Sequence, residues 1–489
     1  MSWVDRLAMR MMPGAYSRYR MNLRRARALY EAEKPTRTFG GKKSRGGPNV
    51  ATKTAPRNLR EVAREFDESN DIASGALDIL TANTIGAGLY PQPHVLDRDG
   101  NPLEEVNAQL DAWHQRWRRK PEVTWTCDEL TAQRLACRTW FRDGEVLAQH
   151  IVGPLSVLTH GLDQVPYSYE LLEPDYLPLE SELHVDVTNG SVFAGIETNG
   201  WGRPVAYHLF REHPGDAVIF GKAPTKRVPA DRISHLKLVK RIGQARGVSV
   251  FATVMTRLHD VREIDESERV AARIAAAFAA VIIKGDSFAY TPPNSDEETG
   301  YRELALEPGM IIDDLMPGEK VESIASNRPN NNLIEFRADQ LRAAAAGIGA
   351  SYSSLSKNYN GTYSAQRQEM VEQRMLYAPI WGAYVAQFEI PKYRNFIDAL
   401  RYSGAVQWPA SMDMNTLYDA VWTQPAMPWI DPFKEAAGWE KLLQMNVETR
   451  ANVIRSRGGN PRDIARQRKL ENEQNGPVVP TQGPGQQQS

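Results

Sequence analysis

The sequence has 489 residues, of which 42% are hydrophobic and 24% charged, and its 59 Lys and Arg nearly balance its 60 Asp and Glu. This length predicts about three structural units rather than one compact core, and the composition is that of a globular protein. A near-neutral chain argues against a tight duplex binder, because such proteins gather many cations against phosphates.

Two further features limit the class of protein. No stretch approaches the roughly 18 uninterrupted apolar residues of a membrane span, and the N-terminus lacks the apolar core of a secretion signal. We therefore expect an intracellular protein with no membrane partner. Cys127 and Cys137 are its two cysteines. Two thiols cannot build a disulfide framework for a chain of this size, so we predict that both are reduced and packed.

The N-terminal segment is strongly basic. Residues 1–60 hold 15 Lys and Arg against the acidic Asp5, Glu31 and Glu33. Its stretch TFGGKKSRGGPNVATKTAP cannot supply a core. We predict that residues 1–56 form a largely disordered arm and linker, which is either simply solvated or binds a partner.

Helices are predicted next. Leu59, Val62 and Phe66 have helical spacing. A second apolar series recurs every three or four residues, at Leu103, Val106, Leu110, Trp113 and Trp117. This spacing places the second series on one helix face. A third helical stretch, DELTAQRLACRTWFRDG, leads into the strand EVLAQHIV, with Gly144 at the break.

Strand patterns dominate from about residue 145 to 240. The runs PYSYELLEP, SVFAGIETNG and RPVAYHLFREHPGD are separated by Gly, Pro and Asn-Gly signals, and Asn199-Gly200 is a good hairpin turn. We predict an irregular antiparallel sheet.

Long helices follow. The stretch RGVSVFATVMTRLHDVREIDESERVAARIAAAFAAVIIKG predicts a helix of nearly forty residues, about 50 Å long if continuous. A Pro- and Gly-punctuated insertion with strand-like pieces occupies 284–330. The helix NLIEFRADQLRAAAAGIG, a polar loop and a long amphipathic helix to about residue 403 come next. The fold class is therefore α+β, mainly helical.

The last part of the chain is predicted to contain the turn-rich stretch WTQPAMPWIDPFKE and two short helices. Asn460 and Pro461 form a good N-cap and first-turn pair for one of them. The chain then runs out into a polar Pro-, Gly- and Gln-rich tail.

Motifs for catalysis or cofactor binding are missing from the sequence. Gly86 and Gly88 lack the third glycine of a dinucleotide fingerprint, and there is no P-loop. His208 and His213 do not have zinc-site spacing. Asp313–Asp314 is predicted to be a solvated turn rather than a hard-metal site. We expect a protein that is not an enzyme, with no catalytic residue, metal or cofactor.

The loop KNYNGTYSAQR interrupts two helical stretches. It begins with the polar and turn-forming residues Lys357, Asn358, Tyr359, Asn360 and Gly361. No G-x-S-x-G motif surrounds the neighbouring serines, so a nucleophile is disfavoured. Instead, Thr362 or Ser364 is predicted to cap the helix that begins near Ala365.

Seven segments in collinear order resemble the portal proteins of tailed bacteriophages, in particular the lambda-type family. They are ANTIGAGLYPQP, ELLEPDYL, GIETNGWGRPVAYHLFREHPGD, SHLKLVKRIGQARGVSVFATVM, PGMIIDDLMPGE, GIGASYSSLSKNYNGTYSAQR and WIDPFKE. The resemblance runs from about residue 55 to 470. The chain departs from the family at Ile242, Asn358 and Ala365, where Pro, Asp and Ser are common. These departures affect residue-specific chemistry and leave the fold assignment intact.

The resemblance implies a portal-protein fold that assembles into a ring with an axial channel, usually of twelve subunits, at one vertex of the capsid. Double-stranded DNA of any sequence would pass through the channel during packaging and ejection. The large terminase would supply ATP hydrolysis, which agrees with the missing P-loop. Further implied partners are head-to-tail connector (neck) proteins, the major capsid protein and scaffold proteins. The implied location is the virion, after assembly in the host cytoplasm.

The resemblance also divides the chain into parts. In chain order they are the wing at 57–247, the first stem helix at 248–283, the clip at 284–330, the second stem helix at 333–348, the tunnel loop at 349–363, the long wing helix at 364–404, the crown helices at 405–470 and a disordered tail at 471–489. The clip would dock terminase and later the neck proteins. Its candidate docking residues are Glu307, Asp313, Asp314, Glu319 and Lys320.

A channel that lets DNA slide cannot bind phosphate tightly, and each lysine is repeated around a ring. The loop offers one cation, Lys357, with neutral hydrogen-bonding groups and Gly361 as a pivot. We expect it to line the channel; the alternative is a buried corner between helices. The competing functions are another head-completion or connector protein and a DNA-processing virion enzyme.

Overall fold

The computed structural model describes residues 47–49, 51–153, 165–179, 190–216, 224–277, 281–283, 320–322, 331–426 and 431–475. The chain divides into two compact units, Met1–Ala51 and Thr52–Ser489. The predicted basic arm therefore lies almost entirely outside the described residues. Apart from Ala51, every element below belongs to the second unit.

The helices that precede the first long strand are α3 (Ala51–Ser69), α4 (Asp71–Ile85), α5 (Glu104–Trp117) and α6 (Glu129–Asp143). Asn70 separates the first two, and its Oδ1 accepts a hydrogen bond from the Ala73 N–H at 3.0 Å, which makes it the N-cap of α4. Gly144 ends α6 in the left-handed conformation (φ 89°), as glycine readily does. The predicted break between helix and strand at Gly144 is confirmed.

The buried faces of these helices follow the predicted spacing with one correction. In α5, Val106, Leu110 and Trp117 are buried as predicted. In α3, however, Val62 is 41% exposed and Ala63 is buried beside Phe66. The predicted helix is confirmed, but its buried face runs through Ala63 and Phe66 and leaves Val62 at its edge.

Two antiparallel sheets follow. The first has the order β3-β2-β8, with β2 (Glu145–Val152) in the centre between β3 (Tyr167–Leu172) and β8 (Ile233–Lys237). The second has the order β4-β5-β6-β7, from β4 (Gly190–Phe193) and β5 (Ile196–Asn199) to β6 (Pro204–Phe210) and β7 (Thr225–Pro229). The predicted turn after Asn199 joins β5 to β6, and the Asn199 N–H donates to the Arg203 carbonyl at 2.9 Å. A short ladder pairs β1 (Gln92–Pro93) with β11 (Ala420–Val421).

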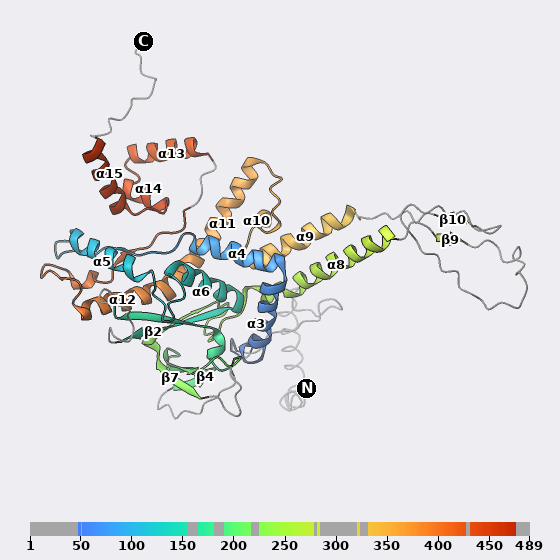
Figure 1. Ribbon diagram of the computed structural model, residues 1–489, viewed down its shortest axis with the longest axis horizontal. Coiled ribbons are helices and arrows are strands. Elements are labelled where there is room, and N and C mark those ends of the chain that lie inside the picture. Colours follow the sequence, from blue (N-terminus) through green and yellow to red (C-terminus); the bar gives the residue numbers. More distant parts are fainter. Residues whose placement is uncertain are drawn as a thin grey trace, which may run out of the picture. The chain divides into compact units, whose positions relative to one another are not determined.

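Helices α6 and α12 (Ile390–Ser403) lie against the sheet that contains β2 (Figure 1). An aromatic cluster forms the core between them. Trp117 stacks on Tyr167 with ring centres 5.5 Å apart, and its Nε1 donates to the Tyr167 carbonyl at 2.8 Å. Phe396 of α12 packs 5.2 Å from the same indole. This core holds α5, β3 and α12 together.

The long helix predicted from about residue 245 is shorter than expected. The turn η4 (Val250–Thr253) comes first, then α8 (Met255–Ala277), and Val281–Ile283 is a strand, β9, that pairs with β10 (Lys320–Glu322). Before it, the Gly247 N–H donates to Glu145 Oε2 at 2.9 Å, and Ser249 Oγ accepts from the Phe251 N–H at 3.1 Å, which makes Ser249 the N-cap of η4. Helix α9 (Asn331–Ile348) contacts α8 (Figure 1).

The predicted long amphipathic helix is present but is divided in three. It consists of α11 (Tyr363–Tyr384), a single π-helical turn (Val385–Glu389) and α12, which ends at Gly404 with a φ of 68°. Pro391 has no N–H to donate, so the regular ladder cannot continue through this point. A short helix, α10 (Tyr352–Ser356), precedes the loop and was not predicted.

The C-terminal part contains α13 (Pro432–Gln444), α14 (Arg450–Ser456) and α15 (Pro461–Asn475). The expectation of two helices, with WIDPFKE as turn, was wrong. Asp431 Oδ1 accepts from the Lys434 N–H at 3.3 Å, so Asp431 caps α13 and Pro432 is its first residue. The predicted cap of α15 is confirmed, because Asn460 Oδ1 accepts from the Arg462 N–H at 3.1 Å.

A fully buried arginine joins the two sheets. Arg246 Nη2 lies 2.6 Å from Glu145 Oε1, and neither side chain is exposed. Its Nη1 donates to the carbonyls of Leu177 and Ala194 at 3.1 and 3.2 Å, and Nη2 donates to that of Pro174 at 3.1 Å. Because the guanidinium is hydrogen-bonded on every side, its charge is tolerated in the interior.

Glu145 is equally well satisfied. Its Oε2 accepts from the Gly247 N–H and lies 3.0 Å from His235 Nε2. Burial alone would raise the pKa of the Glu145 carboxyl, but Arg246 and His235 lower it well below its ordinary value. Glu145 therefore stays ionised and anchors the start of β2.

The described helices include none that is both long and apolar enough to cross a bilayer. Cys127 is half-buried and Cys137 buried, and both are free thiols, as predicted. Burial raises the pKa of the Cys137 thiol well above its ordinary value, so this cysteine is an inert core residue.

We predict that Arg246→Met destabilises the fold by about 3–5 kcal/mol, because it leaves Glu145 buried without its main counter-ion. The measurement is the free energy of unfolding in urea. The matched control is Arg342→Met, whose partner Asp339 is exposed, and we expect it to cost less than about 1 kcal/mol. Equal losses in the two variants would contradict the importance of the buried pair.

Candidate functional site

The predicted loop is a compact, internally hydrogen-bonded turn. Lys357 follows α10 in the left-handed conformation (φ 54°, ψ 24°). The Asn360 N–H then donates to Asn358 Oδ1 at 3.1 Å, and the Gly361 N–H donates to the Tyr359 carbonyl at 2.8 Å. An asparagine that accepts from the backbone two residues on is a stable turn former. The loop thus has a defined shape.

All of these residues are exposed, and Tyr359 shows 56% of its surface. Within the described residues, no carboxylate forms an ion pair with Lys357 Nζ. The loop is therefore not a buried corner of a single chain. With respect to the described carboxylates, it presents the unpaired cation of Lys357 among neutral polar groups.

Two helices hold the loop. Ser351 Oγ accepts from the Ser354 N–H at 3.1 Å and caps α10. The Ser353 hydroxyl and the Ser353 N–H both donate hydrogen bonds to the Glu369 carboxylate of α11, the N–H at 3.3 Å. Gln366 Nε2 donates to the Tyr359 carbonyl at 2.5 Å. The ends of the loop are thus held close together.

Hydroxyl groups around the loop serve local structure. Thr362 is the N-cap of α11, and its Oγ1 accepts from the Ala365 N–H at 3.3 Å. Ser364 lies inside the first turn of α11, with its hydroxyl 3.4 Å from Thr362 Oγ1. Ser356 Oγ donates to the Tyr352 carbonyl at 2.7 Å. These contacts give the hydroxyls capping roles and do not indicate a nucleophile.

The candidate clip residues fall largely outside the description. Glu307, Asp313, Asp314 and Glu319 lie outside the described residues. Lys320 begins β10, where its backbone is opposite Ile283 of β9. Their proposed docking role stays a prediction.

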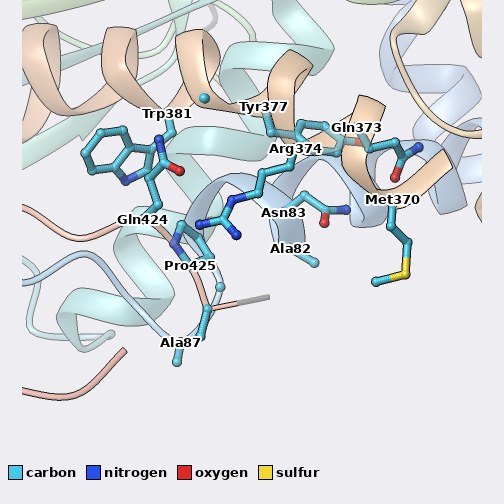
Figure 2. A pocket seen from close by; sticks show the side chains of 13 residues that line it. Ala82, Asn83, Ala87, Met370, Gln373, Arg374, Tyr377, Trp381, Gln424 and Pro425 are labelled. Carbon is cyan, nitrogen blue, oxygen red and sulfur yellow. The ribbon is translucent and has the colours of Figure 1, made fainter. Parts of the chain in front are cut away.

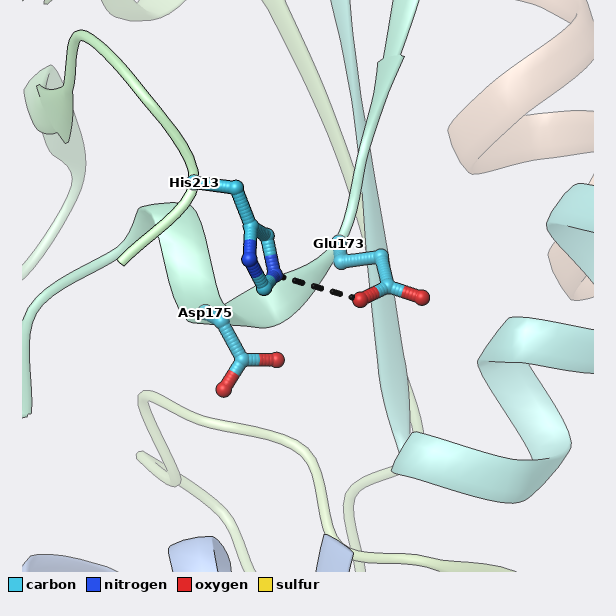
Figure 3. Close-up of side chains that lie close together, drawn as sticks. All are labelled: Glu173, Asp175 and His213. Carbon is cyan, nitrogen blue, oxygen red and sulfur yellow. Dashed lines mark ion pairs between the residues drawn. The ribbon is translucent and has the colours of Figure 1, made fainter. Parts of the chain in front are cut away.

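One histidine-carboxylate cluster has the composition of a metal site. Ligand atoms of Glu173, Asp175 and His213 lie within 4.8 Å of one another, and His213 Nε2 is 3.4 Å from Glu173 Oε2 (Figure 3). Arginines already neutralise it: Arg64 Nη2 is 2.5 Å from Asp175 and 3.1 Å from Glu173. A metal cation would have to displace this guanidinium, so we interpret the cluster as an ion-pair network.

The pKa of Asp175 supports this interpretation. Burial alone would raise the pKa of its carboxyl, but Arg60 and Arg64 lower it below the ordinary value. His208, the other histidine considered in the sequence, is separately paired with Glu197 at 3.3 Å. These histidines and carboxylates support the fold.

A buried lysine fixes the π-helical turn that follows α11. Lys392 Nζ lies 2.6 Å from Glu129 and 2.9 Å from Glu389, and all three side chains are buried. Tyr169 donates its hydroxyl to Glu129 Oε2 at 2.8 Å. One cation thus serves two carboxylates. Burial and the nearby charge of Glu129 raise the pKa of Glu389 to about 7, while the charge of Lys392 acts to lower it.

Sequence reasoning missed both buried clusters. Arg246 lies in the segment RIGQARG and Glu145 directly after Gly144, but their 101-residue separation hides the pairing. The sequence did contain a signal for the second cluster. Glu129, Glu389 and Lys392 each interrupt an otherwise apolar helix face, which indicates buried charges that need partners.

The fold is shared with solved structures of phage-like particles. A neck subunit of the native gene transfer agent (GTA) particle aligns with a TM-score of 0.50 and 13% identity, covering 83% of this chain and 94% of that one. A neck subunit of the empty GTA particle aligns with a TM-score of 0.50 and 14% identity, covering 83% and 95%. The chain therefore shares its fold with a subunit of these neck structures.

The family model of lambda-family phage portal proteins matches residues 34–380. The chain therefore belongs to the lambda family of phage portal proteins. It is 23% identical over 423 residues to the probable portal protein of Halomonas phage phiHAP-1, covering 84% of this chain and 79% of that protein. It is 26% identical over 196 residues to portal protein B of Escherichia phage lambda, covering 36% and 37%.

Family membership confirms the resemblance and the mainly helical α+β fold, and a phage portal role follows from it. The family is structural and non-enzymatic, so the chain is not an enzyme, as expected. The two competing functions, a different connector protein and a DNA-processing enzyme, are set aside.

We predict that stability falls as pH rises from about 4.5 to about 7 through Glu389. In this window the folded carboxyl holds a proton that the unfolded carboxyl has lost, because its pKa is raised from 4.5 to about 7. The free energy of unfolding, measured at pH 5 and 7.5, should drop by about 1–3 kcal/mol more in the wild type than in Glu389→Gln. Glu440→Gln, on an exposed part of α13, is the control and should retain the drop. A wild-type profile equal to that of Glu389→Gln would refute the assignment.

Proposed function

We propose that this portal protein forms a ring of twelve copies at the portal vertex of the virion capsid and conducts double-stranded DNA during packaging and ejection. Family membership carries the proposal. The solved neck structures that share the fold are of C12 and C6 symmetry, and a ring of twelve copies satisfies both. Assembly would take place in the host cytoplasm, with capsid and scaffold proteins as partners.

The parts of the chain acquire roles within this proposal. The helices α8 and α9 would be the stem, and the segment between them, 284–330, would be the clip that docks the large terminase and later the neck proteins. The sheets, α3 to α6 and α11 to α12 would form the wing, and α13 to α15 the crown. The loop between α10 and α11 would face the channel.

The exposed loop supports a role as the contact with moving DNA. Twelve copies would place twelve Lys357 ammonium groups around the axis, and these attract a polyanion without a fixed grip. The Asn358, Tyr359 and Asn360 side chains are neutral, so they add hydrogen bonds but no counter-ion release. A ring with few lumen cations holds DNA loosely enough to let it slide.

The ring predicts a particle of about 660 kDa for twelve copies of 54.9 kDa. Mass photometry of the purified full-length protein should find this species, and negative-stain images should show annuli with one open channel. A chain that stays monomeric under all assembly conditions would rule the ring out.

We expect Lys357→Ala to leave the ring intact and to weaken retention of duplex DNA. The slope of log K against log salt should become shallower by about 1 or more, because each lost phosphate contact removes about 0.9 from it. The measurement is duplex retention by purified rings over a salt series. Lys469→Ala, an exposed lysine of α15, should leave the slope unchanged. Identical slopes for wild type and Lys357→Ala would remove this lysine from the channel contact.

A further inference from the structure

A cavity of about 370 Å³ lies between α4, α11 and residues 424–426 (Figure 2). One wall is the C-terminal end of α4, where Gly86 has a φ of 57° and Pro425 packs directly on it. The opposite wall is α11. A prolyl ring is therefore already seated at the edge of this cavity.

The α11 wall carries a row of hydrogen-bond donors for which the described part of the chain provides no acceptor. Gln373, Tyr377 and Trp381 recur every four residues, so they share one helix face, about 6 Å apart along the axis. Gln373 Nε2, the Tyr377 hydroxyl and Trp381 Nε1 are buried and have no hydrogen-bond partner among the residues that the structure describes. Tyr377 is 6% exposed, and burial raises its pKa to about 12, so its hydroxyl remains a donor.

Unpaired buried donors are costly, and a row of them beside a cavity indicates missing acceptors. Alternate carbonyls of an extended peptide lie about 6–7 Å apart, which matches the row. The remaining lining is largely apolar, with Ala82, Ala87, Met370, Ala378 and Ala426, and its further polar side chains are Asn83, Gln424 and Arg374. The cation of Arg374 disfavours a positively charged ligand, so the ligand class is an extended peptide without basic residues, with apolar side chains and more acceptors than donors. Proline-rich segments have this character, because proline has a carbonyl but no N–H, and such segments dock in aromatic-lined grooves.

The chain itself contains such a peptide. Residues 476–489, GPVVPTQGPGQQQS, have no charged side chain and three prolines, Pro477, Pro480 and Pro484. They follow α15, whose N-cap Asn460 and first-turn residue Asp463 line an adjoining cavity that shares residues 424–426 with this one.

The reach of this tail is sufficient. Helix α15 has 15 residues, about 22 Å at 1.5 Å per residue. Fourteen residues in the polyproline II conformation span about 43 Å. The tail is long enough to return past α15.

We propose that the cavity between α4 and α11 is a docking site for the C-terminal tail, residues 476–489, with its carbonyls accepting hydrogen bonds from Gln373, Tyr377 and Trp381. The site holds the tail of the same copy or of a neighbouring one, and it does not depend on the channel role of the loop. Tail docking would tie the last residues of the chain to α11, the helix that carries the channel loop.

The test is a binding titration with a fluorescently labelled peptide of residues 476–489. The protein is the full chain with Pro477, Pro480 and Pro484 changed to Gly, so that its own tail does not compete. Fluorescence anisotropy should show saturable binding. The same peptide with its three prolines replaced by Gly should not bind.

Matched variants then locate the site. Tyr377→Phe should weaken binding about three- to tenfold, the effect of one hydrogen bond. The control is Tyr393→Phe, because Tyr393 is also buried with an unpaired hydroxyl but does not line the cavity. It should leave binding unchanged. A thermal melt of both variants separates a binding loss from misfolding. No saturable binding, or equal binding by the two variants, would overturn the proposal, and either result would leave the ring proposal untouched.

Discussion

The buried ion pair between Glu145 and Arg246 is the interaction on which the rest of the described fold depends. It joins the start of β2 to the segment before α8. The remaining arginine donors bind the main-chain carbonyls of Pro174, just after β3, and of Ala194, in the turn between β4 and β5. The close approach it requires explains Gly144 and Gly247, since a Cβ at Gly247 would lie 1.9 Å from the Gly144 carbonyl oxygen.

The second buried charge cluster, Lys392 with Glu129 and Glu389, lies just beyond the C-terminal end of α11, opposite the exposed loop at its start. Lys392 gathers Glu129 and Glu389 in the interior, where a lone charge would be very costly. The cluster holds the π-helical turn against α6, so the long helical segment has one permitted position on the sheet. The exposed loop at its start is short, hydrogen-bonded within itself and anchored through Glu369. A rigid scaffold that carries one small exposed loop is the usual arrangement of a contact site.

Much of this fold could be predicted from local chemistry. Gly144, Asn199 and the Asn460-Pro461 pair mark real boundaries, because turns and caps are decided by residues close in sequence. Long-range effects could not be predicted in the same way. The buried pair of Glu145 and Arg246 joins residues about a hundred positions apart, and α3 buries Ala63 rather than Val62. For the site, the loop residues and the Thr362 cap were visible in the sequence, whereas the donor row of α11 emerged only when α4 and Pro425 were placed beside it.

In the proposed ring, the loop geometry would suit contact with a moving polymer. One lysine per copy would give a weak ring of charge, and the neutral residues around it would give short-lived contacts. The central claim is that this loop faces the axis of the assembled ring. The most direct measurement is a cryo-EM reconstruction of the purified ring without imposed symmetry. We expect twelve subunits with residues 357–361 lining the channel. A ring in which this loop lies on the outer surface would contradict the proposed channel role of the loop.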